Sequence, residues 1–270
     1  MVENRPAANG RLAVQGVTSA NPDGYTLLFG GVAQIIMLPL LEKDLPYDAL
    51  KDLRMISAMS RFDLAIGVGS VSEYKTLSDL NRRVRNTSSP AIYATAGVGP
   101  LAPIGLAAMV YTRILGGKSE AASYQSGPAG IIDLVAGRVD YAFMTVTDAA
   151  QFQSTGKLRV LAVANADSSK WLPGVPTFAE AGLPEFQKVS SWGFFNALMA
   201  PKNTPTEIVD KLNRAINEAF QEPEFKARLE SAKLVNMTGR SAAVYDKYWQ
   251  EEYERYQIIL KQYELTITTK

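Results

Sequence analysis

The chain has 270 residues, and its apolar share of 47% is that of a globular protein with one large domain or two of ordinary size. Its 28 basic and 27 acidic residues leave a net charge of +1 without a Lys/Arg-rich run, which argues against nucleic-acid binding. Histidine and cysteine are absent, which excludes Cys-His and Ser-His-Asp catalysis and zinc sites built on imidazole or thiolate. No apolar run reaches the roughly 18 residues of a membrane span, so direct membrane insertion is not expected. No cofactor is expected either.

The first part of the chain predicts short elements separated by tight turns. The most specific signal is Pro22 followed by Gly24, because proline presets one backbone angle of a turn and glycine takes a positive one. The expected elements are a helix at 9–20, a turn at 21–24, a buried strand at 25–29 that ends at Gly30 and Gly31, a buried helix start or packed loop at 32–41, and strands at 53–58 and 64–68.

The middle of the chain alternates strands with helices. Thr76 and Asp79 have the spacing of a capping box and are expected to open a helix. Pro100 suits the first turn of another helix, where its missing N–H leaves no bond unmade. The expected elements are helices at 76–85, 101–115, 131–136 and 148–155, strands that begin at 91, 121, 139 and 158, and glycine-bearing turns at 95–99 and 124–130.

The last part is expected to hold one strand and three helices after a stretch rich in turn formers. Thr204 and Glu207 have the spacing of a second capping box, and Ser241 opens a long final helix with a core-facing aromatic stripe. The strand is expected at 192–200. This alternation of strands and helices predicts an α/β fold with mostly parallel sheets flanked by helices.

Two of the turns are candidate anion sites. Residues 95–99 and 124–130 both place glycines before a helix start, where unpaired N–H groups and the helix dipole favour an anion. The alternative is that both are simple strand-to-helix turns. Neither matches the phosphate loop or the G-x-G-x-x-G pattern, which argues against nucleotide binding.

Other candidate residues give weaker signals. Gly30 and Gly31 could contact a ligand or form a simple packing turn. The sequence offers no catalytic partner for four scattered acids, which are Asp63, Asp133, Asp140 and Asp148.

Short motifs occur in a characteristic order over nearly the whole chain. They are residues 2–6 (VENRP), 22–28 (PDGYTLL), 45–48 (LPYD) with Lys51 and Asp52, 156–163 (GKLRVLAV), 172–182 (LPGVPTFAEAG), 190–192 (SSW) and 200–201 (AP). With these motifs the chain resembles the solute-binding receptors of tripartite tricarboxylate transporters, the Bug family. The resemblance implies a two-lobed, type II periplasmic binding protein-like fold with an interlobe cleft. Lobe 1 would comprise residues 1–68 and 197–270, and lobe 2 residues 69–196.

The resemblance also implies a function. The chain would be a periplasmic, non-enzymatic solute-binding protein that captures a small carboxylate and hands it to the membrane permease subunits of a transporter. The carboxylate could be a dicarboxylate, a tricarboxylate or an aromatic acid. Two alternatives stay open, a small α/β enzyme acting on a carboxylic acid and a ligand-sensing partner of a signalling protein.

The resemblance carries ligand-binding roles over to residues that match the family's loops. They are Gly31, Gln34, Thr95, Ala96, Gly97, Val98, Gly99, Tyr124, Ser126, Gly127 and Thr145. Several positions that are usually polar in the family are apolar here, among them Val98 and Met144. An aromatic or otherwise partly apolar acid is therefore the hypothesis for the ligand.

The family pattern begins with a strand, a glycine-containing ligand loop and a helix that precede the VENRP motif, and the sequence does not contain them. An interior strand that is missing leaves ladder groups unpaired. The resemblance therefore predicts impaired ligand binding, or a second chain that replaces the missing strand. Without such a replacement, the protein is expected to be a monomer.

Overall fold

The computed structural model describes residues 1–5, 10–42, 44–96, 103–190 and 194–265. The chain divides into two compact units, Met1–Arg61 with Phe194–Lys270 and Phe62–Gly193. The predicted lobe boundary after residue 68 falls inside the strand Leu64–Gly69, which pairs with strands of the second unit. The predicted boundary after residue 196 falls inside the strand Phe194–Pro201, whose residue Asn196 pairs with Gly31 in the first unit.

Unit 1 is built on a four-stranded sheet with the strand order β1-β8-β2-β9. Its β1 pairs antiparallel with β8, and its β2 pairs antiparallel with β9. The elements of unit 1 are α1 (Arg11–Thr18), β1 (Leu28–Gly31), the π-helix η2 (Ala33–Met37), α2 (Leu38–Leu41), α3 (Ala49–Asp52), β2 (Leu53–Phe62), β8 (Phe194–Pro201), α9 (Thr206–Ala219), α10 (Pro223–Ser231), β9 (Val235–Asn236) and α11 (Ala242–Gln262).

The aromatic stripe predicted for the last helix is confirmed, and it lies on the buried face of α11. Tyr245, Trp249 and Tyr256 are all at most 2% exposed, as the helical spacing of these residues predicts. Glu252 lies on the same face and is buried. Its Oε1 forms an ion pair with Arg255 Nη1 at 3.1 Å. Burial raises the pKa of Glu252, because the charged form loses its hydration.

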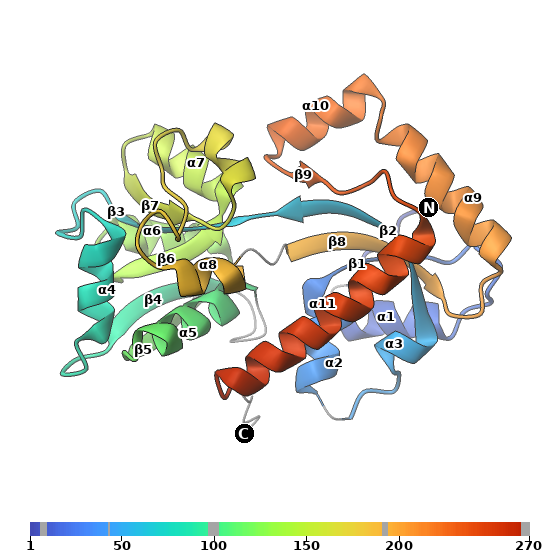
Figure 1. Ribbon diagram of the computed structural model, residues 1–270, viewed down its shortest axis with the longest axis horizontal. Helices are drawn as coiled ribbons and strands as arrows, with labels where there is room; N and C mark the ends of the chain where they lie inside the picture. Colours follow the sequence, from blue (N-terminus) through green and yellow to red (C-terminus); the bar gives the residue numbers. More distant parts are fainter. Residues whose placement is uncertain (6–9, 43, 97–102, 191–193, 266–270) are drawn as a thin grey trace. The chain divides into compact units, whose positions relative to one another are not determined.

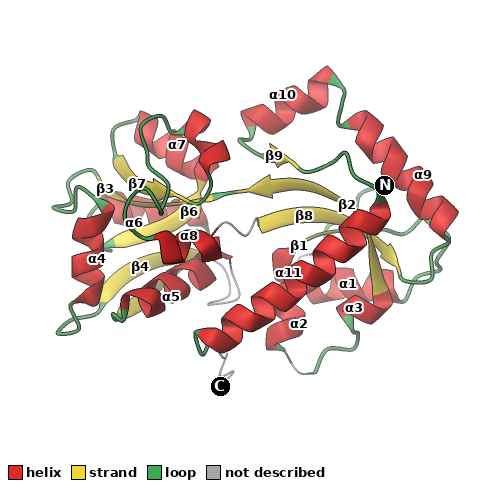
Figure 2. Cartoon of the chain, viewed as in Figure 1, coloured by secondary structure: helices red, strands yellow, loops and turns green. Residues whose placement is uncertain are grey.

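Unit 2 is built on a five-stranded sheet with the order β5-β4-β6-β3-β7. Figure 2 shows helices around the strands of this unit. The elements of unit 2 are β3 (Leu64–Gly69), α4 (Leu77–Arg85), β4 (Ala91–Ala96), α5 (Pro103–Leu115), β5 (Ser119–Tyr124), α6 (Gly127–Val135), β6 (Tyr141–Thr145), α7 (Val146–Ser154), β7 (Leu158–Val163), the 3-10 helix η4 (Ala166–Trp171) and α8 (Pro184–Ser190).

The expectation of mostly parallel sheets is wrong, because antiparallel strand pairs occur in both sheets. In unit 2, β4 is parallel to β5 and to β6, as helical crossovers between strands require. Strand β3 runs antiparallel to β6 and to β7 and lies between them. The chain reaches β3 directly from β2 across the single residue Asp63, so no crossover helix sets its direction. The α/β class is confirmed, with mixed sheets flanked by helices.

Helices α5 and α6 cover opposite faces of the sheet in unit 2 (Figure 1). Tyr141 of β6 contacts Tyr111 of α5, with ring centroids 5.7 Å apart. The next residue, Ala142, belongs to the buried cluster that contains Ile131 of α6. Neighbouring residues of a strand point to opposite faces, so the two helices lie on the two sides of β6.

One of the two predicted capping boxes is present. Thr76 accepts a hydrogen bond from the Asp79 N–H, and the Asp79 carboxylate accepts one from the Thr76 N–H at 2.8 Å. The box predicted at Thr204 is wrong, because α9 has Pro205 as its N-cap and no side-chain cap. Thr204 is instead buried, and its carbonyl accepts a hydrogen bond from Arg54.

Within the described part of the chain, every helix is too short or too polar to span a membrane.

We expect Gly69→Ala to destabilise the protein, because Gly69 lets β3 approach α6 closely. A Cβ atom at this position would lie 2.5 Å from the Leu134 carbonyl oxygen, which belongs to the backbone and cannot rotate away. The expected loss in the free energy of unfolding is about 3 kcal/mol or more, from overpacking. Urea denaturation of the purified protein measures it.

Gly137→Ala is the matched control. Gly137 has a positive φ of 73° and no atom within 4 Å of a Cβ, so alanine there meets only backbone strain, about 1 kcal/mol. A Gly69→Ala variant that loses no more stability than Gly137→Ala would contradict the close approach of β3 and α6.

Candidate ligand-binding site

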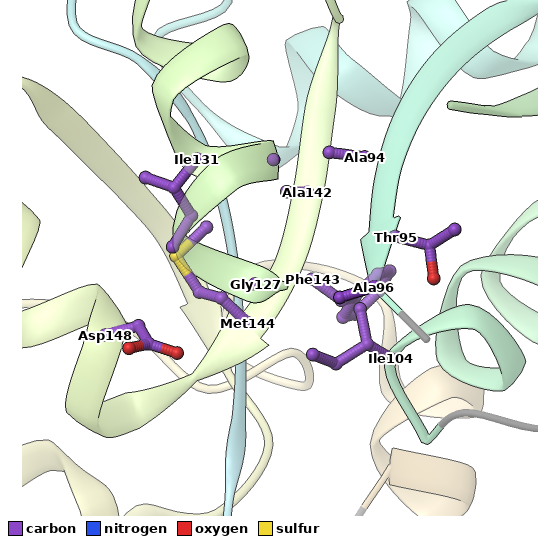
Figure 3. A pocket seen from close by; sticks show the side chains of 11 residues that line it. Ala94, Thr95, Ala96, Ile104, Gly127, Ile131, Ala142, Phe143, Met144 and Asp148 are labelled. Carbon is purple, nitrogen blue, oxygen red and sulfur yellow. The ribbon is translucent and has the colours of Figure 1, made fainter. Parts of the chain in front are cut away.

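A pocket lies in unit 2 where β4 and β6 end (Figure 3). It is lined by Ala94, Thr95, Ala96, Ile104, Gly127, Gly130, Ile131, Ala142, Phe143, Met144 and Asp148. Because β4 and β6 are parallel, their carboxyl ends meet at one edge of the sheet, which is where α/β proteins bind ligands. Helices α5, α6 and α7 supply the remaining lining residues.

The walls of the pocket are mostly apolar and are supported by the core. Phe143 is 2% exposed and packs with its ring centroid 5.4 Å from that of Phe186 and 5.6 Å from that of Tyr111. On the α6 side, Ile131 and Met144 belong to one buried cluster. Close packing of this kind leaves these side chains little freedom to move, so the shape of the pocket is largely fixed.

Two side chains bring polar atoms to the lining. Thr95 is 3% exposed, and its Oγ1 has no hydrogen-bond partner among the described residues. A buried hydroxyl without a partner is costly, which makes Thr95 a candidate contact for a ligand. The second is Asp148, whose carboxylate stands on the other side of the lining in Figure 3.

Two helices begin beside the pocket with side-chain caps. Helix α6 has Ser126 as its N-cap, which accepts a hydrogen bond from the Ala129 N–H at 3.4 Å. Helix α7 has Thr145 as its N-cap, which accepts one from the Asp148 N–H at 3.1 Å. The positive ends of two helix dipoles therefore lie at this edge of the sheet.

The structure brings together some of the predicted site residues. Thr95, Ala96 and Gly127 line the pocket, and Thr145 directly follows the lining residue Met144. Ser126 caps α6 without lining the pocket itself.

The remaining predicted residues belong to unit 1, lie outside the described residues, or have a partner on α6. Gly31 and Gln34 belong to unit 1, where the Gly31 N–H donates to the Gln34 side-chain oxygen at 3.1 Å. Gly97, Val98 and Gly99 lie outside the described residues.

Tyr124 has a defined partner on α6. Its hydroxyl donates a hydrogen bond to Asp133 Oδ2 at 2.8 Å, so this group can only accept a further bond from a ligand. Asp133 also receives a hydrogen bond from Arg138 at 2.6 Å. The bond from Tyr124 and then the one from Arg138 lower the pKa of Asp133, because both favour the carboxylate.

Sequence reasoning missed Asp148 and the apolar wall of Ile104, Ile131 and Phe143. One signal could have found Asp148. Thr145 and Asp148 have the threonine-to-acid spacing of a helix start, which places Asp148 in the first turn after β6. No comparable local signal marks Ile104 or Phe143, because their positions depend on which strands and helices pack together.

Comparison with known proteins identifies the family. The model of the tripartite tricarboxylate transporter family receptor, TctC, matches residues 1–265. The chain belongs to this receptor family. The family consists of solute-binding receptors and not of enzymes, and the described residues of this receptor contain no group of three acidic side chains that could hold a metal ion.

Relatives of the receptor come from several bacteria. A UPF0065 protein of Bordetella bronchiseptica is 35% identical over 242 residues, which are 90% of this chain and 68% of the relative. BugT of Bordetella pertussis is 32% identical over 82% of this chain and 66% of its own. The structure of MatC from Rhodopseudomonas palustris with bound malate has a TM-score of 0.80 at 27% identity, covering 96% of this chain and 87% of MatC.

We expect Tyr124→Phe to raise the pKa of Asp133 toward the ordinary aspartate value of about 3.9, because the largest cause of its lowering is removed. A carboxyl with a lowered pKa in the folded state adds stability above its unfolded-state pKa and loses it as the pH falls through the folded-state pKa. The acid-induced loss of stability should therefore be shallower in Tyr124→Phe.

NMR titration of the side-chain carboxyls measures this shift. Asp79 is the internal control, since its pKa is lowered by Thr76 and not by Tyr124. If the pKa of Asp133 is the same in both proteins, the bond from Tyr124 does not hold the carboxylate.

Proposed function

We propose that this receptor captures a small carboxylate in the pocket of unit 2 and delivers it to the membrane permease of a tripartite transporter. The observation that carries the proposal is the family match over residues 1–265, combined with a pocket at the carboxyl ends of β4 and β6. The solved relative MatC, which holds malate, supports a carboxylate as the ligand.

The pocket suits an anion that is held by neutral donors. Its lining contains no lysine or arginine among the described residues. The starts of α6 and α7 supply positive dipole ends, which the Asp148 carboxylate offsets on its own side of the pocket, and the Thr95 hydroxyl supplies a buried donor on the other side. Neutral donors of this kind stabilise a carboxylate without the cost of burying a fixed counter-charge.

The apolar walls favour an acid with an apolar part. Ile104, Ile131 and Phe143 would cover the hydrocarbon or aromatic portion of the ligand, and each square ångström buried contributes about 25 cal/mol. An aromatic or partly apolar acid is the ligand class that we favour within the carboxylates.

The family supports a periplasmic location and a transporter partner. Receptors of this family serve tripartite transporters by the family's description, and a relative that is 25% identical is described as a periplasmic transporter. We propose the same location and a permease partner for this chain.

We expect carboxylates to raise the melting temperature of the receptor in a thermal-shift screen. At a concentration of one hundred times the dissociation constant, a ligand stabilises the folded state by about 2.7 kcal/mol, a rise of about 5 °C or more. The screen compares dicarboxylic, tricarboxylic and aromatic acids with the corresponding amides, which lack the charge. A receptor that responds to none of the acids, or equally to acids and amides, would contradict the proposal.

Gly127→Val tests whether the ligand binds in the pocket of unit 2. Apart from its chain neighbours, a Cβ at Gly127 has only the Asp148 carboxylate within 4 Å, at 3.8 Å, so the larger side chain would occupy space in the pocket that Gly127 lines. The expected loss in affinity is about tenfold or more, or about 1.4 kcal/mol. Ile132→Ala is the control, because Ile132 lies on the same helix and is 60% exposed. Equal affinities of the two variants, measured by calorimetry, would show that the ligand binds elsewhere.

A further inference from the structure

The carboxylate of Asp148, which lines the pocket, can accept more hydrogen bonds than it receives. Its Oδ2 accepts a hydrogen bond from the Thr145 hydroxyl at 2.8 Å, and the Thr145 hydroxyl is its one side-chain or backbone donor among the described residues. A carboxylate offers about four acceptor positions on its two oxygens. Most of the capacity of this carboxylate is therefore open to a ligand.

Asp79 is a useful comparison, because it has the same position at the start of a helix but does not line the pocket. It too follows a threonine N-cap by three residues. Its carboxylate accepts hydrogen bonds from the N–H groups of Lys75 and Thr76, from the Thr76 hydroxyl and from Arg82. Asp148 has the same helix position without these additional donors, and it lines a pocket.

The place of Asp148 also changes the charge of the pocket. Its Oδ2 lies 3.8 Å from the position of a Cβ on Gly127, the first residue of α6. The negative charge of Asp148 therefore stands where the dipole of α6 would otherwise favour a ligand carboxylate. A second carboxylate placed there would be repelled, whereas a hydroxyl or ammonium group would donate a hydrogen bond to Asp148.

We propose that Asp148 determines specificity, by selecting acids that carry a hydroxyl or ammonium donor over the unsubstituted acid with the same skeleton. This inference rests on the proposed function. The ligand carboxylate would lie toward Thr95, whose buried hydroxyl has no partner among the described residues, and the donor would lie toward Asp148. The ligand class is thus the hydroxy acids and amino acids.

The test uses two matched ligand series and calorimetry on the full chain. Succinate, malate and aspartate share one skeleton with hydrogen, hydroxyl or ammonium at the same carbon. Phenylacetate, mandelate and phenylglycine form the aromatic series. We expect the donor-bearing acids of at least one series to bind about tenfold tighter than the unsubstituted acid, the effect of one hydrogen bond to a charged group.

Asp148→Asn removes the charge with little change in shape and should reduce this preference to about threefold or less. Asp79→Asn is the matched control, since it neutralises a carboxylate at the same helix position outside the pocket lining and should keep the full preference. Circular-dichroism melts compare the folding of the two variants. Asp148→Ser, which keeps an oxygen acceptor, takes the place of Asp148→Asn if the latter does not fold.

The possible outcomes separate the two proposals. If acids bind without preference for a donor, or if the preference survives Asp148→Asn, the role of Asp148 is overturned and the carboxylate receptor stands. If Asp79→Asn abolishes the preference as well, the effect belongs to helix capping and the role of Asp148 is again overturned. If no acid of either series or of the wider screen binds, the proposed function itself fails.

Discussion

The buried carboxylate of Asp63 is the interaction on which the arrangement of unit 2 depends. Asp63 is 3% exposed and lies where the chain passes from β2 into β3. Its carboxylate accepts hydrogen bonds from Asn165 at 2.8 Å and Ser168 at 2.6 Å, and its carbonyl accepts one from the Val146 N–H at 3.0 Å. Hydrogen bonds to a charged group contribute about 1.5–3 kcal/mol each, and a buried charge without them is far more costly.

These hydrogen bonds connect Asp63, between β2 and β3, to the elements that form the pocket. Val146 is the first residue of α7, so the bond from its N–H to Asp63 fixes the helix that carries Asp148. The aromatic packing around Phe143 fixes the apolar wall in the same way. The pocket therefore combines a rigid apolar surface with a small number of positioned polar atoms. This is the usual composition of a small-molecule site, in which the apolar area supplies affinity and the polar atoms supply orientation.

Helix starts show how far local patterns reach. The spacing of Thr76 and Asp79 predicted a capping box that the structure contains, because both partners lie within one turn. The same spacing at Thr204 and Glu207 failed, since Thr204 is buried and held through its carbonyl by Arg54, a residue remote in the sequence. At Thr145 and Asp148 the local pattern was present, but the role of Asp148 follows from its neighbourhood to α6 and not from its own helix.

The sequence by itself determined the α/β class, the family, the absence of histidine and cysteine chemistry, and the candidate positions Thr95 and Gly127, which line the pocket. Periodicity, caps and ordered motifs carry these features because they depend on neighbouring residues or on inheritance. Only the tertiary structure decided that β3 runs against β6 and β7, and that Asp148 stands beside Gly127. Both are consequences of long-range pairing between segments, which no local pattern encodes.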